Sequence, residues 1–101
     1  VLEAVSAMEN HMGDPLSLAQ LASIAGVTPR HLNRLFTSAL GKSCMVFYRD
    51  MRLALGQKLV KSSALPLGEI AEATGFSSAG HFSTAYKDQY GARPRQHRQA
   101  P

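Results

Sequence analysis

One sequence pattern occurs twice in this chain of 101 residues. Residues 18–28 read LAQLASIAGVT, and residues 67–77 read LGEIAEATGFS. Each copy continues into a second amphipathic segment, which closes at Gly41 in the first copy and at Gly91 in the second. The offset between the copies is 49 residues before the turn and 50 residues after it. A short helix, a glycine-containing turn and a second helix form the helix-turn-helix pattern, whose second helix enters a groove of DNA.

The composition suits one compact domain or two very small ones. Hydrophobic residues make up 45% of the chain, which is enough for a core, although a copy of about 45 residues alone would be marginally stable. No segment resembles a membrane span or a signal peptide, so we expect no membrane partner. The single cysteine, Cys44, excludes an internal disulfide framework and fits a reducing cytoplasm. Because a helical pattern is already present at Val1, we expect a fragment of a longer protein.

Positive charge is concentrated in two stretches that lack carboxylates, and the net charge of the chain is +4. Residues 15–49 and 89–101 contain no Asp or Glu, and their basic residues are Arg30, Arg34, Lys42, Arg49, Arg93, Arg95 and Arg98. Each phosphate that a basic side chain neutralises releases counterions, so such stretches favour double-stranded DNA as a partner. A surface that is merely basic is the alternative.

Helical signals cover the chain and no segment shows the alternation of a strand, so we predict an all-α fold with about seven helices. Ser17 is the predicted N-cap of the second helix, and Gly26 is its predicted stop. Thr28 followed by Pro29 predicts the start of the third helix. The other helices are predicted to begin near Leu2, Ser43, Pro66, Ser77 and Pro94, and the first of them to end at Gly13.

The spacing of apolar residues predicts the face that each helix buries. In the first four helices these residues are Leu2, Val5, Met8, Met12, Leu18, Leu21, Ala22, Ile24, Leu32, Leu35, Phe36, Ala39, Leu40, Cys44, Tyr48, Met51, Leu55 and Leu59. In the second amphipathic segment of the later copy they are Phe82, Ala85 and Tyr86. The faces opposite these residues are the candidate binding surfaces.

A long central helix separates the two copies. It is predicted to run to about Ser62, and about 19 residues at 1.5 Å each give roughly 28 Å. Recognition helices on one side of DNA must lie about 34 Å apart. We therefore expect two helix-turn-helix subdomains, residues 1–43 and 64–101, joined by a rigid linker helix at residues 44–63. Gly56 within this helix is expected to permit close helix packing, with a hinge as the alternative.

The first predicted recognition helix, residues 29–40, presents side chains that distinguish bases. Opposite its buried face lie Arg30, Asn33, Arg34 and Thr37. Arginine pairs bidentately with guanine and asparagine with adenine, so these four residues are predicted base contacts. Arg30 and Arg34 are one turn apart and should enter the same groove. A solvated helix face is the alternative.

The second predicted recognition helix, residues 78–90, presents short side chains instead. Its predicted base contacts are Ala79, Gly80, Ser83 and Thr84. Alanine and threonine can touch a thymine methyl group and glycine allows close backbone approach, but none of them pairs bidentately with guanine. We therefore predict that the first copy provides most of the direct base readout. The second copy would contribute phosphate contacts, shape complementarity and at most a thymine preference.

A further set of residues is predicted to contact DNA phosphates. Helix N-termini bind anions through their N–H groups, and the starts near Pro29, Ser43 and Ser78 are candidates. The predicted phosphate contacts are Thr28, Lys42, Ser43, Arg49, Ser78, His81, Lys87 and Arg95. Such contacts position a protein on the duplex without reading its sequence.

No pattern in the chain indicates an enzyme, a cofactor or a metal site. The four histidines lack a His-Glu-x-x-His arrangement or paired cysteines, and the matched places of His31 and His81 indicate a shared structural role. Cys44 at a helix start is a candidate reactive thiol, but a partly buried, inert cysteine is the preferred interpretation. The main alternative function is a helix-turn-helix protein-interaction module, which would need exposed apolar anchors.

Together, the ordered motifs resemble the DNA-binding domain of AraC/XylS-type transcription regulators. The resemblance rests on PRHLNRLF at residues 29–36, Gly41 and Ser43, Arg52-Leu53, Glu69-Ile70-Ala71, and GFSSxxHFSxxYKxxYGxxPxxxR at residues 75–98. It implies seven helices, two helix-turn-helix units joined by a linker helix, and recognition of adjacent major grooves. It also implies RNA polymerase as a partner and an N-terminal sensing and dimerisation domain in the full-length protein. The sequence His81-Phe82-Ser83 is similar to a branch in which that domain resembles a glutamine amidotransferase.

Four positions depart from the pattern of this family. Thr84 stands where the second recognition helix usually has an arginine, which fits the predicted asymmetry between the copies. Gly56 replaces the usual alanine, Cys44 the usual proline, and His97 a common aromatic residue. None of these changes removes a core position.

Overall fold

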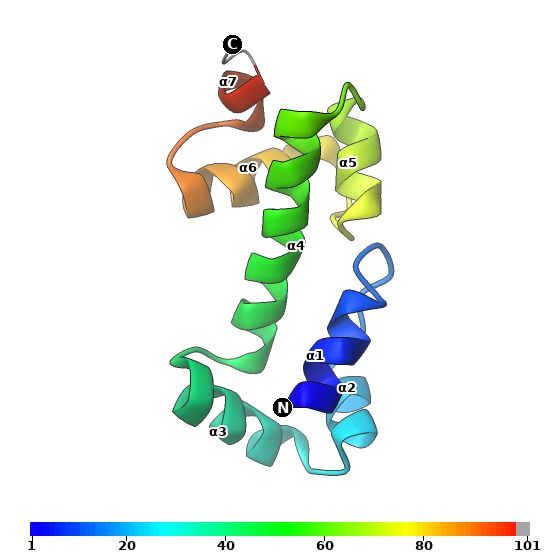
Figure 1. Ribbon diagram of the computed structural model, residues 1–101, viewed down its shortest axis with the longest axis vertical. Coiled ribbons are helices and arrows are strands. Elements are labelled where there is room, and N and C mark those ends of the chain that lie inside the picture. Colours follow the sequence, from blue (N-terminus) through cyan, green and yellow to red (C-terminus); the bar gives the residue numbers. More distant parts are fainter. Residues whose placement is uncertain (99–101) are drawn as a thin grey trace. The chain divides into compact units, whose positions relative to one another are not determined.

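The computed structural model describes residues 1–98, and all of their regular secondary structure is helical (Figure 1). The helices are α1 (Leu2–Glu9), α2 (Leu18–Ala25), α3 (Pro29–Leu40), α4 (Cys44–Ser62), α5 (Leu67–Ala73), α6 (Ala79–Tyr90) and α7 (Pro94–Arg98). The prediction of an all-α chain with about seven helices is therefore confirmed. The chain forms two compact units: unit 1 comprises Val1–Arg49 and unit 2 begins at Asp50, so the boundary lies within α4. The last three residues of the predicted subdomain 64–101 lie outside the described residues.

Side-chain caps determine where α2 and α3 begin. Ser17 forms a capping box: its hydroxyl accepts from Gln20 N–H at 3.1 Å, and Gln20 Oε1 accepts from Ser17 N–H at 2.8 Å. Before α3, Thr28 Oγ1 accepts from His31 N–H at 3.1 Å, and Pro29 occupies the first helical position. The predicted caps at Ser17 and Thr28 are confirmed.

Both predicted recognition helices end at a glycine in the left-handed conformation. Gly41 after α3 and Gly91 after α6 each have a φ of 75°, and their N–H groups donate to the carbonyls of Thr37 and Lys87. A residue with a Cβ atom would be strained at this φ, so glycine is the natural end of each helix. The two helices, of 12 residues each, therefore share a length and a terminus.

Unit 1 has a core of its own, which α1, α2, α3 and the start of α4 provide. Its buried hydrophobic residues are Ala4, Met8, Leu21, Ala22, Leu32, Phe36, Cys44 and Tyr48. Tyr48 also holds the segment between α1 and α2, because its hydroxyl donates to the carbonyl of His11 and accepts from Leu16 N–H at 3.2 Å. These partners lie 37 and 32 residues away in sequence, beyond the reach of any helical pattern.

Several residues of unit 1 that were predicted to be buried are exposed. Leu2, Ile24 and Leu40 have exposed fractions of 82%, 50% and 41%, and Ala39 is also exposed. In addition, α1 ends at Glu9, well before its predicted stop. An apolar stripe of four or five positions is wider than the area that short neighbouring helices cover, so its edges remain in solvent.

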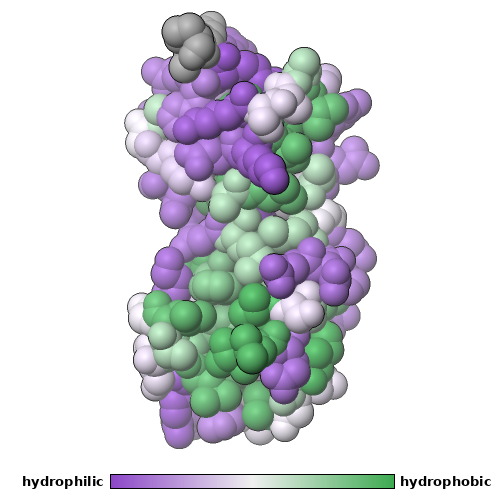
Figure 2. Space-filling model, in the orientation of Figure 1, coloured by the Kyte–Doolittle hydropathy of each residue, from purple (hydrophilic) through white to green (hydrophobic). Residues whose placement is uncertain are grey.

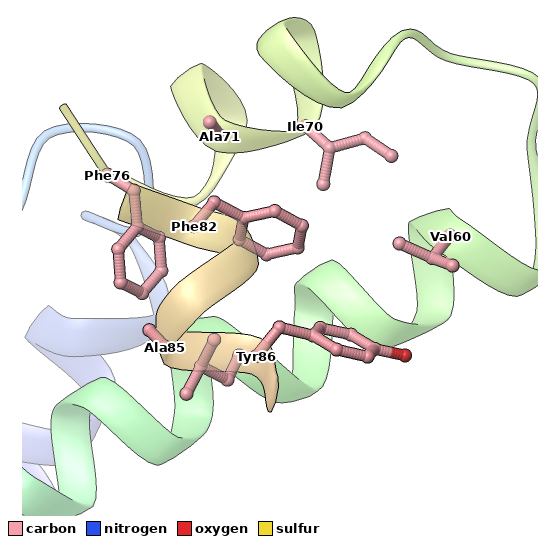
Figure 3. Packing of buried hydrophobic residues seen from close by; sticks show 8 residues of the cluster. Val60, Ile70, Ala71, Phe76, Phe82, Ala85 and Tyr86 are labelled. Carbon is pink, nitrogen blue, oxygen red and sulfur yellow. The ribbon is translucent and has the colours of Figure 1, made fainter. Parts of the chain in front are cut away.

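Unit 2 packs the aromatic rings of α6 against α4 and α5 (Figure 3). Its buried cluster consists of Leu53, Val60, Ile70, Ala71, Phe76, Phe82, Ala85 and Tyr86. The Phe82 ring lies at the centre of the aromatic group, with its centroid 5.6 Å from the centroids of both Phe76 and Tyr86. The predicted buried face of α6, formed by Phe82, Ala85 and Tyr86, is confirmed.

Gly56 permits a close approach between α4 and α6. A Cβ atom at Gly56 would lie 2.5 Å from Cε1 and 2.8 Å from Cζ of Phe82. Cβ contacts under 3.0 Å are essentially never seen in real proteins, so any larger residue requires the Phe82 ring to move. The prediction that Gly56 serves helix packing is therefore confirmed.

The predicted stripe of α4 is correct only where the helix begins. Cys44 and Tyr48 are buried as expected. The remaining predicted positions are only half-buried: Met51, Leu55 and Leu59. The positions that are buried in unit 2 are Leu53, Gly56 and Val60. A single stripe assumes one partner surface, whereas α4 contributes to the cores of two units, and each core selects its own positions.

Candidate nucleic-acid interface

The exposed face of α3 carries long basic side chains. Arg30, Arg34 and Thr37 are exposed, while Leu32 and Phe36 on the other side of the helix are fully buried. Arg30 and Arg34 are four residues apart, so their side chains project from one face about one turn apart. The stretch that contains them has no acidic residue, which leaves a positive surface for an anionic ligand. Three of the four predicted base contacts of unit 1 are thus exposed residues of α3.

Asn33 has a different environment from the other three. It is half-buried, and its Oδ1 accepts from the backbone N–H of Cys44, the first residue of α4, at 3.1 Å. Bidentate pairing with adenine requires both the oxygen and the amide nitrogen of an asparagine. The bond to α4 uses one of the two lone pairs of this oxygen, so the adenine contact stays a prediction. Asn33 also acts as a cap that ties α4 to α3.

The outer face of α6 carries short side chains, as the sequence indicates. Gly80 and Thr84 are exposed, whereas Ala79 and Ser83 are half-buried. Lys87 is exposed further along the helix, and α6 contains no arginine. Direct contact with a base edge would therefore need a close approach of the α6 backbone.

An arginine from outside α6 reaches this face. Arg93, in the loop between α6 and α7, is exposed, and its Nη1 donates to Ser83 Oγ at 3.3 Å. Its backbone N–H donates to Gln96 Oε1 at 2.8 Å, which caps the start of α7. The sequence pattern placed Arg93 only in a basic tail and not among the site residues. A signal was present, because Arg93 follows Ser43, a predicted phosphate contact, at the repeat offset of 50 residues.

Matched hydroxyl caps begin α3 and α6. Ser78 Oγ accepts from His81 N–H at 3.0 Å, as Thr28 Oγ1 does from His31 N–H. The two histidines therefore supply the same backbone N–H to the cap in the first turn of each helix, a role that any residue other than proline could fill. The His81 side chain makes a further contact, with its Nδ1 3.0 Å from Ser77 Oγ. Thr28, Ser78 and His81 are all exposed, as a phosphate contact requires.

The other predicted phosphate contacts differ in exposure. Lys42, Lys87 and Arg95 are exposed, and Ser43 and Arg49 are half-buried. Ser43 Oγ accepts from Val46 N–H at 3.4 Å in the first turn of α4. The exposed residues can reach a ligand as they stand, whereas Ser43 and Arg49 offer only part of their surface.

Arg52 fixes the turn that precedes α6. Its Nη1 donates to the carbonyls of Thr74 at 3.2 Å and Gly75 at 3.0 Å, and its guanidinium carbon lies 4.6 Å from the centroid of the Phe76 ring. Charge-assisted hydrogen bonds and the cation–π contact join α4 to this turn. Arg52 is thus a positioning residue for α6, a role that the sequence pattern did not reveal.

The chemistry of Cys44 is that of a buried thiol. The side chain is fully buried, and burial raises the pKa of the thiol. Because the thiolate is the reactive form, the raised pKa favours the inert cysteine over the reactive one. Within residues 1–98, no group of three or more His, Cys, Asp or Glu side chains is arranged to hold a metal ion. None of the helices of this described part combines the length and apolar character that crossing a bilayer requires.

Large apolar side chains are exposed on unit 1. They are Leu2, Ile24, Leu40, Met45 and Val46, with exposed fractions between 39% and 82%. Figure 2 shows apolar residues gathered on the face that this unit presents in that view. Exposed apolar side chains of this kind can serve as anchors for a protein partner.

Comparisons with known proteins identify relatives that match most of the chain. The family described as Helix-turn-helix domain matches residues 21–100. The HTH-type transcriptional regulator GlxA of Rhizobium meliloti is 42% identical over 94 residues, which are 93% of this chain and 29% of that relative. The chain therefore spans less than a third of the length of GlxA.

Solved structures show the same fold. A transcriptional regulator from Chromobacterium violaceum, described as having an AraC-type DNA-binding domain, is 37% identical with a TM-score of 0.91. The similarity covers 96% of this chain and 87% of that one. The DNA-binding domain of AdpA, solved in complex with a target DNA, is 25% identical with a TM-score of 0.89, again over 96% and 87% of the two chains.

Proposed function

Because this chain belongs to the AraC-type helix-turn-helix family, we propose that it binds double-stranded DNA sequence-specifically as part of a bacterial transcription regulator. The relative described as a transcriptional regulator and the AdpA domain solved with its DNA support this function. The observation that carries the proposal is the exposed face of α3, where Arg30 and Arg34 stand one turn apart in a stretch without acidic residues.

In the proposed complex, α3 and α6 enter successive major grooves and make unequal contributions. α3 supplies most of the direct base readout through Arg30, Arg34 and Thr37, because guanidinium groups pair bidentately with guanine. Asn33 caps α4 through the hydrogen bond from Cys44 N–H. α6 contributes short side chains that can touch thymine methyl groups and allow close approach, namely Ala79, Gly80, Ser83 and Thr84. The length of α4, 19 residues or about 28 Å, is of the order of the roughly 34 Å that separates successive major grooves on one side of DNA, which supports the use of two grooves by one chain.

Phosphate contacts would set the position of each unit on the duplex. The candidates are Thr28, Lys42, Ser43, Arg49, Ser78, His81, Lys87 and Arg95. Thr28 and Ser78 begin helices whose first N–H groups and dipole favour an anion. Removal of any basic residue of this set should weaken binding about equally for all sequences and should reduce its salt dependence.

The full regulator is proposed to have further parts and partners. An N-terminal sensing and dimerisation domain would control DNA binding, and contact with RNA polymerase would regulate transcription in the bacterial cytoplasm. The 29% share of GlxA that this chain spans supports the presence of further sequence in the full regulator. A run-off transcription assay with purified RNA polymerase tests the second. The domain should change the transcript yield from a promoter that carries its site, and an unchanged yield would contradict the contact.

Selection of bound duplexes from a random pool tests the main proposal. The domain, as a monomer, should enrich one sequence whose affinity exceeds that of random DNA by about 10³-fold or more. The logarithm of its affinity should fall linearly with the logarithm of salt concentration. Equal affinity for selected and random DNA would contradict sequence-specific binding, and binding of a single site only by dimers would contradict two recognition helices on one chain.

A protein-interaction module is the second candidate, which the exposed apolar side chains of unit 1 favour. Under this alternative, the random pool would yield no enriched sequence. The double variant Arg30→Ala/Arg34→Ala would then leave the activity of the full regulator unchanged, whereas Met45→Ser/Val46→Ser would abolish it. The DNA-binding proposal expects the arginine pair to matter.

A further inference from the structure

The second recognition helix has no arginine, but the structure brings one to its outer face. Gly80, Ser83 and Thr84 are three and four residues apart and therefore share one side of α6. Arg93 Nη1 donates to Ser83 Oγ at 3.3 Å, which places the guanidinium beside this side of the helix. The residues of α6 itself give this face only short side chains, but Arg93 from the following loop lies at its edge.

The repeat explains why Arg93 occupies this place. At the offset of 50 residues, Ser83 corresponds to Asn33 and Pro94 corresponds to Cys44. In unit 1, Asn33 accepts from the N–H of Cys44. Proline has no N–H, so the equivalent bond cannot form at Pro94. In unit 2, Ser83 accepts from the Arg93 side chain instead.

The Arg93 side chain is held in place and remains accessible. Its backbone is fixed by the hydrogen bond to Gln96 Oε1 at 2.8 Å and by Pro94, which is fully buried. The side chain itself is exposed. A guanidinium has five N–H donors, and the bond to Ser83 is the one hydrogen bond of this guanidinium within residues 1–98. The other donors therefore remain for an acceptor outside the protein.

The chemistry of this place fits the edge of a guanine. Residues 89–101 contain no acidic residue, so the segment of Arg93 supplies no carboxylate that would compete for its charge. A guanidinium supported by a hydroxyl presents a planar fork, which matches O6 and N7 of guanine in the major groove. We propose that Arg93 reads a guanine in the part of the DNA site that α6 contacts. Unit 2 then obtains direct base readout from a residue outside its recognition helix, an inference that rests on the proposed DNA-binding function.

Selection and titration of DNA with Arg93 variants test this proposal. At the selected site, Arg93→Ala should lose roughly five- to one hundred-fold in affinity and relax preference at one base pair that Arg34→Ala leaves unchanged. Arg93→Lys keeps the charge without the fork, so it should retain affinity for random DNA and lose the preference at that base pair. Ser83→Ala removes the supporting hydroxyl and should weaken the same preference by a smaller factor. Lys61→Ala, at an exposed position of α4, is the matched control for the loss of one charge.

Three results would overturn the proposal. They are an equal loss in Arg93→Ala and Lys61→Ala on all DNA, an unchanged base preference in Arg93→Lys, and an effect at the base pair that Arg34 controls. Thermal melting of the Arg93 variants should match the wild type, because the Arg93 side chain is exposed, and this measurement separates lost recognition from unfolding. If these results appear while the wild-type domain still enriches one sequence, only the role of Arg93 fails. If the wild-type domain enriches none, the proposed function itself fails.

Discussion

The two predicted recognition helices have the same length and the same kind of ends, but different side chains on their outer faces. α3 and α6 each have 12 residues, begin after a hydroxyl cap and end at a left-handed glycine. On their outer faces, however, Arg30 and Arg34 of α3 correspond to Gly80 and Thr84 of α6. The repeat therefore preserves a scaffold and not a binding chemistry. Caps and buried contacts determine the backbone of both helices, whereas exposed positions contribute little to folding and are free to differ.

The supports of the two helices differ as well. In unit 1, a neutral cap joins α3 to the following helix through Asn33 and Cys44. In unit 2, the charged side chain of Arg52 holds the turn before α6, and the Arg93 side chain bonds to Ser83 within α6. Unit 2 thus relies on arginines outside its recognition helix, both to position that helix and, in our proposal, to contact DNA.

Replacing the outer residues of α3 with the corresponding residues of α6 should cause the largest loss of specific DNA binding. The double variant Arg30→Gly/Arg34→Thr should lose about 2–6 kcal/mol of specific binding, because each bidentate arginine contact contributes about 1–3 kcal/mol. Fluorescence anisotropy with the selected duplex measures the loss. Thermal melting provides the control, since glycine in a helix costs roughly 1 kcal/mol of stability by itself.

The reverse exchange places an arginine on the outer face of α6. Thr84→Arg should add a preference at one base pair, whereas Thr84→Ala should leave the selected sequence unchanged. If Thr84→Ala alters the selected sequence as strongly as Arg34→Ala does, the two helices contribute equally and the proposed asymmetry is wrong.

Gly56→Ala should destabilise unit 2 and leave unit 1 intact. The new Cβ would lie 2.5 Å from the Phe82 ring, and such overpacking costs about 1–3 kcal/mol, against roughly 1 kcal/mol gained in helix propensity. Denaturant unfolding, followed by NMR signals of each unit, measures the change. Gly68→Ala is the matched control, because its Cβ would meet nothing within 4 Å and should stabilise the protein slightly. Adding Phe82→Leu should reduce the cost of Gly56→Ala, and the absence of any such coupling would refute the close approach.

Asn33→Ala should lower the stability of the protein. Loss of the bond to Cys44 N–H removes a helix cap, which contributes about 0.5–2 kcal/mol. Asn33→Asp keeps the acceptor and should restore the stability, while its negative charge weakens DNA binding. A variant Asn33→Ala with normal stability would contradict the cap, and a lost adenine preference would establish Asn33 as a base contact.

Alkaline pH should have the smallest of these effects, a difference between the two units in the pH at which each begins to lose stability. Burial raises the pKa of the Cys44 thiol in unit 1 above its ordinary 9.0, and that of the Tyr86 phenol in unit 2 above its ordinary 10.0. Such a group stays neutral in the fold while the unfolded chain ionises. The stability it contributes is therefore complete below the ordinary pKa and is lost as pH rises through the raised value. Unit 1 should begin to lose stability above about pH 9 and unit 2 above about pH 10.

An alkaline titration followed by amide NMR signals of each unit checks this order. Cys44→Ala removes the thiol and should delay the loss in unit 1, with no effect on unit 2. If both units lose stability at the same pH, in the wild type and in the Cys44→Ala variant alike, then the two units do not respond to separate ionisations.

Much of the helical framework could be predicted because its signals are local. The caps at Ser17 and Thr28 and the stop at Gly26 act within three or four residues of where they stand. The burial faces were predicted less well, since Ile24 and Leu40 follow the helical period and yet are exposed. Whether a neighbouring helix covers a stripe depends on contacts that no periodicity contains.

For the candidate site, the sequence predicts which side chains of α3 are exposed but not which partners they have. Arg30 and Arg34 are exposed opposite the buried face of α3, as the helical period requires. Asn33 has the right residue type and falls at the margin of the same face, but its partner at Cys44 lies 11 residues away. The partner of Arg93, Ser83, lies 10 residues away across a turn. Side-chain pairs of this separation form only after the helices have packed.

Local signals in the sequence establish the helices, the caps at Ser17 and Thr28, and the stops at Gly26, Gly41 and Gly91, because these depend on interactions within about one helical turn. The doubled pattern that indicates the family is likewise visible in the sequence. The tertiary structure alone decided which residues of α4 each unit buries, that Gly56 makes room for Phe82, and that Asn33 serves as a cap. It also decided that Arg93 lies against α6. Helix signals act between residues close together in the chain, whereas the surroundings of a side chain depend on distant segments that packing brings together.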